Sequence, residues 1–195
     1  MELNEAYWSA RYKNGQTGWD IGYVSTPIKT YIDQLESKEV SILIPGAGNA
    51  YEAEYLWKAG FRNVTVIDLS QEPLENLKKR IPDFDKELLI RGDFFDLNET
   101  YDLVIEQTFF CALNPSLRKA YVKKMSELIN PKGRLVGLLF NIPLFDDHPP
   151  FGGNSAEYKP LFEQYFHIKV METAYNSINP RYGNELFINM SPLKK

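Results

Sequence analysis

The sequence predicts an α/β protein with a doubly wound sheet of seven strands, mostly parallel with one antiparallel strand, preceded by an N-terminal helical arm. Short apolar, β-branched runs alternate with helix-like segments along the middle of the chain. Such alternation is typical of a parallel sheet with helices on both faces. A glycine turn follows the first run, and acidic residues or glycines close several later ones. Signals at successive strand ends indicate a ligand crevice at the carboxyl edge of the sheet.

The predicted elements follow in chain order. The arm, residues 1–36, combines helical patterns over 4–12 and 27–35 with a flexible loop from Lys13 to Gly18. Pro131, Lys132 and Gly133 are expected to end a helix and begin the fifth strand. We expect strands near 40–45, 63–68, 87–91, 101–106, 134–140, 166–174 and 185–190, and further helices near 50–59, 71–80, 115–129 and 156–165.

The glycine turn comes directly after an apolar run and contains Gly46 and Gly48. Glycine adopts backbone angles that a residue with a Cβ resists, and it lets a ligand approach the main-chain amides closely. A tight turn without a ligand is the simpler interpretation of this pair alone. The next β-branched run closes with Asp68, at about the spacing at which an acid meets a ribose in dinucleotide-binding folds. Together the two features indicate a site for an adenosine cofactor.

Tyr51 helps to distinguish between two such cofactors. A nicotinamide site favours a third glycine three residues after Gly48, where this chain has Tyr51. S-adenosylmethionine has no pyrophosphate, so its site needs a glycine turn, an acid for the ribose and a clamp for adenine. After the third predicted strand, Asp93 could accept a hydrogen bond from the adenine amino group and Phe94 could cover the ring. The alternative for this segment is a capped turn with core aromatic residues.

Four segments carry a resemblance that covers nearly the whole chain: Tyr7–Tyr12, Thr17–Gly22, Ile44–Gly48 and Glu106–Ala112. In them the chain resembles class I S-adenosylmethionine-dependent methyltransferases, within these the thiopurine S-methyltransferase-like family, which includes plant thiol and halide methyltransferases. Ala47 departs from the cysteine expected in many relatives, but a methyl in place of a thiol leaves the turn intact. The resemblance implies a Rossmann-like sheet, S-adenosylmethionine as cofactor and a small acceptor.

The resemblance also implies a set of cofactor-lining residues, to which we add neighbours of the same signals. The family pattern covers Trp19, Gly46, Asp68, Asp93, Phe94, Glu106, Gln107 and Thr108, and we assign Trp8, Gly48 and Leu69 to the same site. Trp19 lies in a glycine-rich polar loop where core packing explains it poorly, so we expect it near the sulfonium, which aromatic faces attract. For Tyr7, Trp8 and Phe109, packing in the core or in a lid is an equal alternative.

The composition limits the number of domains and the kinds of partner that we expect for this chain. With 195 residues, of which 44% are hydrophobic, the chain can form one core, and we expect a single domain over residues 1–195. The net charge of −4 argues against nucleic acid, whose binding depends on neutralising phosphates. Cys111, the single cysteine, permits no internal disulfide and suits a reducing cytoplasm. With neither an export signal nor a membrane-spanning stretch in the sequence, we expect a soluble, cytoplasmic monomer.

The acceptor side offers few catalytic candidates. Methyl transfer from a sulfonium is an in-line displacement, so the enzyme mainly aligns the acceptor and excludes water. His148, in a loop after the fifth strand, and Arg181, which could face an anionic acceptor, are candidates; exposed loop residues are the alternatives. His167 and Cys111 are better explained as structural residues. Neither a general base nor metal-ligand spacing is evident, which favours a pre-ionised acceptor such as a thiolate, hydrosulfide or iodide.

Two other functions stay open on the sequence alone. A nicotinamide-dependent reductase, using NAD(P), would share the glycine turn and Asp68 but would leave the aromatic arm and Gly92-Asp93-Phe94 unexplained. A non-catalytic S-adenosylmethionine-binding domain would share all of these features, because a fold does not establish turnover.

Overall fold

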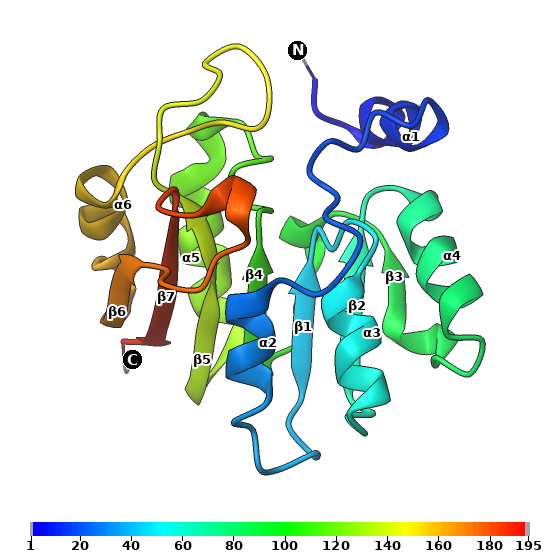
Figure 1. Ribbon diagram of the computed structural model, residues 1–195. Coiled ribbons are helices and arrows are strands. Elements are labelled where there is room, and N and C mark those ends of the chain that lie inside the picture. Colours follow the sequence, from blue (N-terminus) through cyan, green and yellow to red (C-terminus); the bar gives the residue numbers. More distant parts are fainter. Residues whose placement is uncertain (1, 194–195) are drawn as a thin grey trace.

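A computed structural model describes residues 2–193 and shows a seven-stranded sheet with helices on both faces (Figure 1). The strand order is β3-β2-β1-β4-β5-β7-β6. The strands are β1 (Ile42–Pro45), β2 (Val64–Asp68), β3 (Leu89–Arg91), β4 (Tyr101–Gln107), β5 (Ile129–Phe140), β6 (Phe166–Thr173) and β7 (Glu185–Pro192). The α-helices are α1 (Glu5–Lys13), α2 (Thr26–Ile32), α3 (Tyr51–Lys58), α4 (Gln71–Arg80), α5 (Arg118–Leu128) and α6 (Ser155–Phe162). Four short 3₁₀ helices are η1 (Lys86–Leu88), η2 (Phe94–Asp96), η3 (Pro115–Leu117) and η4 (Asn179–Arg181).

The sheet topology confirms the predicted fold class. β1 pairs in parallel with both β2 and β4, so the strand order reverses at β1 and opens a crevice at its carboxyl end. β7 runs antiparallel to β5 on one side and to β6 on the other, and it is the one antiparallel strand. The carboxyl ends of β1, β2 and β4 therefore meet at the same edge of the sheet.

The largest difference from the predicted boundaries lies between α5 and β5; α2 and α6 each end three residues earlier than predicted. α5 ends at Leu128, and β5 already begins at Ile129, so Pro131 and Gly133 lie inside the strand instead of ahead of it. The pairing with β4 is irregular here, because Tyr101 faces Ile129 whereas Leu103 faces Arg134. A bulge thus accommodates the proline and the glycine, which a regular central strand does not tolerate well.

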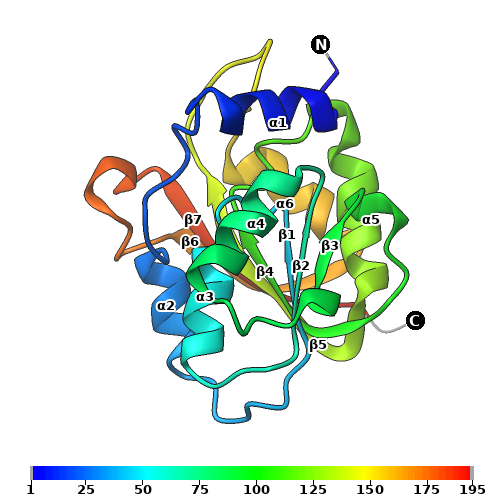
Figure 2. The same cartoon turned by 90° about the vertical axis from the view of Figure 1, so that its right-hand side faces the viewer.

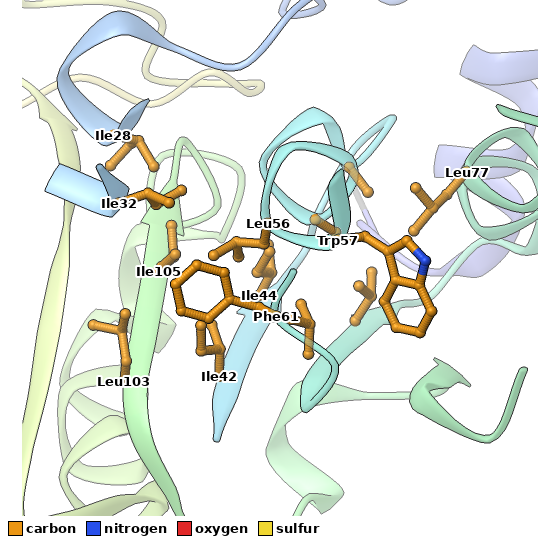
Figure 3. Packing of buried hydrophobic residues seen from close by; sticks show 14 of the residues in the cluster. Ile28, Ile32, Ile42, Ile44, Leu56, Trp57, Phe61, Leu77, Leu103 and Ile105 are labelled. Atoms are coloured by element: carbon orange, nitrogen blue, oxygen red, sulfur yellow. The ribbon is translucent and has the colours of Figure 1, made fainter. Parts of the chain in front are cut away.

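The apolar residues form two clusters, one on each face of the sheet. The first joins the sheet to α2, α3 and α4; Ile28, Leu56 and Trp57 belong to it (Figure 3). The second joins the sheet to α5 and α6 through Tyr121, Phe162 and their neighbours. Burial of both faces explains why the strands read as nearly continuous apolar runs.

The N-terminal arm divides into two parts with different packing. α2 is part of the core, since Ile28 and Ile32 are fully buried. α1 lies across the carboxyl edge of the sheet, above the ends of the strands (Figure 2), with Ser9 as its one buried residue. Only the segment before α2 therefore has the position of a lid. Within residues 2–193, no helix is long and apolar enough to cross a membrane.

Candidate active site

The glycine turn lies at the carboxyl end of β1 and adopts a conformation that demands glycine. Gly46 has φ +54° and Gly48 has φ +53°, and a Cβ on Gly46 would lie 2.1 Å from the ring of Phe109. The Gly46 N–H donates to the carbonyl of Ile67 in β2 at 2.8 Å, which fixes the turn to the neighbouring strand. The turn then leads through Ala50 into α3.

Asp68 ends β2 beside this turn, and its carboxylate is almost completely buried, with 9% of the residue exposed. One oxygen accepts the N–H of Ser70 at 2.9 Å, and the main chain of Gly48 also donates to the carboxylate. Burial nevertheless outweighs these hydrogen bonds and raises the pKa of Asp68 to about 7. The group is therefore poised to gain from further hydrogen-bond donors.

The segment after β3 is a capped turn. The side chain of Asp93 is exposed, and it accepts the N–H of Phe95 at 2.9 Å. The ring of Phe94 is buried, with 3% of the residue exposed, and packs 5.4 Å from Phe109 and 5.6 Å from Tyr121 between ring centroids. The Phe94 side chain thus supports the site from within the core, while Leu69 is half-buried next to Asp68.

Glu106 shapes the loop after β4 from beneath. It is fully buried, and its carboxylate accepts the N–H groups of Phe109 at 2.6 Å and Phe110 at 3.0 Å, together with the hydroxyl of Tyr121. These bonds hold a tight bend in which Thr108 has φ +62°. Burial raises the pKa of Glu106 to about 7. The known partners of the Glu106 carboxylate are thus groups of the protein, and its role is to hold the loop after β4.

The arm brings aromatic rings onto the glycine turn. The indole Nε1 of Trp19 is 3.5 Å from where a Cβ on Gly48 would lie. Trp8 and Tyr12 pack edge-on against Trp19, with centroids 5.6 and 5.7 Å away. Burial raises the pKa of the Tyr12 hydroxyl far above its usual range, so this hydroxyl stays neutral. Two segments distant in sequence, the arm and the loop after β1, thus form one site.

Three polar residues of this site were not predicted from the sequence. Asp20 accepts from the side-chain amide of Asn49, and its other oxygen accepts the N–H of Gly22 at 2.7 Å. The hydroxyl of Ser25 donates to the side-chain oxygen of Gln107 at 3.0 Å. Asn49 follows the glycine turn directly, and Asp20 follows Trp19. Their position next to a recognised motif was the sequence signal by which these two residues could have been identified.

Arg181 lies in η4 and its side chain is largely buried. The alternative that Arg181 is an exposed loop residue is therefore wrong. Its side chain is 11% exposed; one terminal nitrogen donates to the carbonyl of Trp19 at 2.7 Å, and the other lies 3.3 Å from Glu185. His148 contacts its own loop, at 3.0 Å from the carbonyl of Pro149 and 4.0 Å from the Phe145 ring centroid.

The structure confirms that Cys111 is buried, with 5% exposed, and its thiol donates to the carbonyl of Thr108 at 2.9 Å. Burial raises the pKa of this thiol, which makes it a poor nucleophile. His167 is exposed on β6, the edge strand farthest from the glycine turn. The described residues contain no cluster of His, Cys, Asp and Glu that could hold a metal ion.

Solved structures similar to this one include methyltransferases crystallised with S-adenosyl ligands. A Burkholderia thailandensis 1,6-didemethyltoxoflavin-N1-methyltransferase with S-adenosylhomocysteine has a TM-score of 0.74 at 16% identity, covering 98% of this chain and 87% of the other. Magnesium protoporphyrin IX methyltransferase from Synechocystis, also with S-adenosylhomocysteine, has a TM-score of 0.73 at 13% identity, covering 96% and 97%. The fold is that of the Rossmann-like S-adenosylmethionine-dependent methyltransferases.

Sequence comparison then defines the family. Residues 3–186 match the family model of thiopurine S-methyltransferase, and the chain belongs to this family. A probable thiol methyltransferase 2 from Arabidopsis thaliana is 28% identical over 94% of this chain and 84% of its own length. Thiocyanate methyltransferase 1 from Brassica oleracea is 27% identical over 94% and 83%. Thiopurine S-methyltransferase from Acinetobacter baylyi is 23% identical over 93% and 94%.

The chain is therefore an S-adenosylmethionine-dependent methyltransferase, and the alternatives of a nicotinamide-dependent reductase and of a non-catalytic domain are wrong. The site fits this cofactor chemically. Asp68 is a buried acceptor whose carboxylate can accept further hydrogen bonds. Gly46 and Gly48 have positive φ angles and give the turn a shape that glycine readily adopts, with the Phe109 ring against Gly46 and the Trp19 indole against Gly48.

Proposed function

We propose that the chain transfers the methyl group of S-adenosylmethionine to a small, soft nucleophile: a thiol, a thiopurine-like compound, hydrosulfide or a halide ion. The observation that carries the proposal concerns the two ionisable side chains at the end of β4 and in the loop that follows it, Glu106 and Cys111, both of which are engaged by the protein. Glu106 is bound to the loop it supports, and Cys111 is locked in a neutral state. Such a site suits an acceptor that arrives already ionised. The names of the relatives, thiol, thiocyanate and thiopurine methyltransferases, agree with this class.

We assign the cofactor contacts as follows. The Asp68 carboxylate accepts from the ribose hydroxyls, and the main chain at Gly46 and Gly48 receives the methionine end. Asp93 accepts from the adenine amino group, while Leu69 and the main chain of Phe94 border the adenine ring. The further residues of the proposed cofactor site are Trp8, Trp19, Glu106, Gln107 and Thr108. Glu106 acts there by shaping the loop that carries Gln107 and Thr108.

Bound S-adenosylmethionine supplies a methyl group made electrophilic by the sulfonium. The acceptor's lone pair forms the new bond to the methyl carbon as the carbon–sulfonium bond breaks, and S-adenosylhomocysteine leaves. The task of the protein is to hold this line of attack and to exclude water. Trp19 covers the glycine turn, with its indole Nε1 and Cδ1 nearest to Gly48. A cation–π contact of this ring with the sulfonium would contribute about 0.5–2 kcal/mol.

A panel of acceptors tests the proposal. Purified protein is incubated with S-adenosylmethionine and, separately, an aromatic thiol, an alkyl thiol, hydrosulfide, iodide, a catechol and a primary amine. The proposal expects methylated sulfur or halide products and S-adenosylhomocysteine in equal amounts. Turnover of the catechol or the amine in preference to every sulfur and halide acceptor would overturn it. Asp68→Ala serves as the control, since it should slow every reaction alike at low cofactor concentration.

We also propose that the enzyme acts in the cytoplasm as a monomer, without nucleic acid or a membrane as partner. The single cysteine supports a reducing compartment such as the cytoplasm. The net charge of −4 supports the absence of nucleic acid as a partner. Light scattering on a sizing column would measure the oligomeric state, and a dimer mass at micromolar concentration would contradict the proposed monomer.

A further inference from the structure

Arg181 and Trp19 are 162 positions apart in sequence and joined by a hydrogen bond of 2.7 Å. η4, which carries Arg181, belongs to the connection between β6 and β7, whereas Trp19 belongs to the arm. The acceptor is the main-chain carbonyl of Trp19, so the contact fixes the backbone that carries the indole and leaves the ring itself free to face the glycine turn.

The guanidinium of Arg181 is itself held in place. Its second terminal nitrogen pairs with Glu185, which is 2% exposed and begins β7 opposite Phe140 of β5. The guanidinium also lies over the Phe140 ring, 5.5 Å from its centroid. Arg181 therefore links the arm to a fixed point of the sheet, and its planar fork can serve both partners at once.

The residue after Trp19 is fastened to the other side of the crevice. Asp20 accepts from the side-chain amide of Asn49, next to the glycine turn, and from the hydroxyl of Tyr51 at 3.5 Å. The pair Trp19–Asp20 thus bridges the loop after β1 and the loop before β7. A segment held at both ends has a defined position, which is what a side chain covering a cofactor requires.

We propose that Arg181 is a positioning residue for methyl transfer: it holds the arm closed through the carbonyl of Trp19 and so fixes the indole over the cofactor. This inference rests on the proposed role of Trp19. It differs from the sequence-based hypothesis that Arg181 faces an anionic acceptor, because here the guanidinium acts on the reaction through Trp19 and contacts no substrate.

Arg181→Lys tests the inference, because lysine keeps the positive charge beside Glu185 but lacks the fork that serves two partners. The matched control is Arg62→Lys. Arg62 also donates to main-chain carbonyls, those of Trp57 at 2.7 Å and Phe61 at 3.0 Å, but it precedes β2 at the opposite edge of the sheet. A second variant, Arg181→Gln with Glu185→Gln, removes both charges together and avoids an unpaired buried carboxylate.

Three readouts are measured: the dissociation constant of S-adenosylhomocysteine, amide hydrogen exchange of residues 15–22 in that complex, and KM and kcat for a neutral thiol and for iodide. Both Arg181 variants are expected to weaken binding about 10-fold, to raise exchange in the arm and to lower kcat, with an unchanged KM for both acceptors. Arg62→Lys is expected to match the wild type.

Arm exchange and S-adenosylhomocysteine affinity equal to wild type in both variants would overturn the inference. So would a KM that rises for iodide alone while arm exchange stays unchanged, because Arg181 would then contact the acceptor directly. The first two readouts use no acceptor, so failure of the soft-nucleophile proposal would leave them intact and would be seen only in the acceptor panel.

Discussion

Asp68 combines a buried carboxylate with a position next to the glycine turn. The pKa of about 7 shows that burial disfavours the charge more than the surrounding main-chain N–H groups favour it. A ligand that brings two further hydroxyl donors therefore stabilises the ionised form. We therefore expect cofactor affinity to respond strongly to a substitution of Asp68.

Asp68→Ala is predicted to weaken S-adenosylmethionine binding by about 10- to 150-fold, since hydrogen bonds to a charged acceptor contribute about 1.5–3 kcal/mol. Titration calorimetry measures the change. Asp83→Ala is the control, because Asp83 is also an aspartate that accepts a hydrogen bond, from the indole of Trp57 at 3.1 Å, and it lies outside the proposed site. Unchanged affinity in a folded Asp68→Ala variant would remove Asp68 from the cofactor site.

The raised pKa of Asp68 also predicts a pH dependence. Its folded pKa of about 7 lies above the unfolded value of about 3.9, so in cofactor-free protein the free energy of unfolding decreases as pH rises from about 4 to about 7. Cofactor binding favours the ionised carboxylate, so affinity should fall as pH drops below about 7, with proton release on binding.

Calorimetry in two buffers of different ionisation enthalpy detects the released proton. Glu106 has a similarly raised pKa, so the assignment to Asp68 requires that Asp68→Asn abolish the effect. Proton release that persists in Asp68→Asn would contradict the assignment.

Cys111→Ser is predicted to keep kcat within a few-fold of wild type. The thiol is buried, neutral and bonded to the carbonyl of Thr108, and serine can donate to the same carbonyl. Burying a hydroxyl in place of a sulfhydryl should lower the melting temperature. A folded, cofactor-binding Cys111→Ser variant without activity would show that the thiol takes part in the reaction.

The arm before α2 is attached to the rest of the molecule mainly by polar contacts. Ser9 and Lys13 reach Glu72 of α4 at 2.8 and 3.2 Å, and Glu5 pairs with Arg91. The two ion pairs, Lys13–Glu72 and Glu5–Arg91, are partly or largely exposed and contribute little. A groove of about 510 Å³ lies between α1 and α4. Weak attachment together with an aromatic anchor on the glycine turn is what a lid needs.

The arm is accordingly predicted to exchange its amide hydrogens quickly without ligand and slowly with S-adenosylhomocysteine. Hydrogen exchange followed by mass spectrometry of residues 7–22 measures this, with the core helix α5 as the internal reference. Equal protection of the arm in both states would contradict its role as a lid.

The elements themselves were largely predictable, because apolar β-branched runs and helical patterns are local features of the sequence. The start of β5 was not, since the bulge opposite Tyr101 and Leu103 depends on pairing with β4. Gly46 and Asp68 could be recognised in the sequence because each stands at or directly after the end of an apolar run, whereas the bond from Arg181 to Trp19 joins distant segments and could not be predicted. The buried packing of Phe94 also depends on Phe109 and Tyr121, which local sequence does not reveal.

The proposed site lies where the strand order reverses. Both faces of the sheet are covered by helices, so the carboxyl edge is the place where main-chain groups of several strands are accessible together. α1 covers this edge from above (Figure 2), and the connection between β6 and β7 closes it from the side of β7. A site enclosed in this way would exclude water around the proposed reaction, which depends on alignment more than on proton transfer.

The most direct test of this account is kcat/KM against pH for two thiols whose pKa values differ by about two units, a difference that thiol substituents readily produce. Because the site is proposed to use no general base, each profile should rise with the thiolate fraction of its own thiol, and the more acidic thiol should reach its plateau at lower pH. Two superimposable profiles, rising at one pKa for both thiols, would contradict the account and would indicate an enzymatic base, with His148 the first residue to substitute.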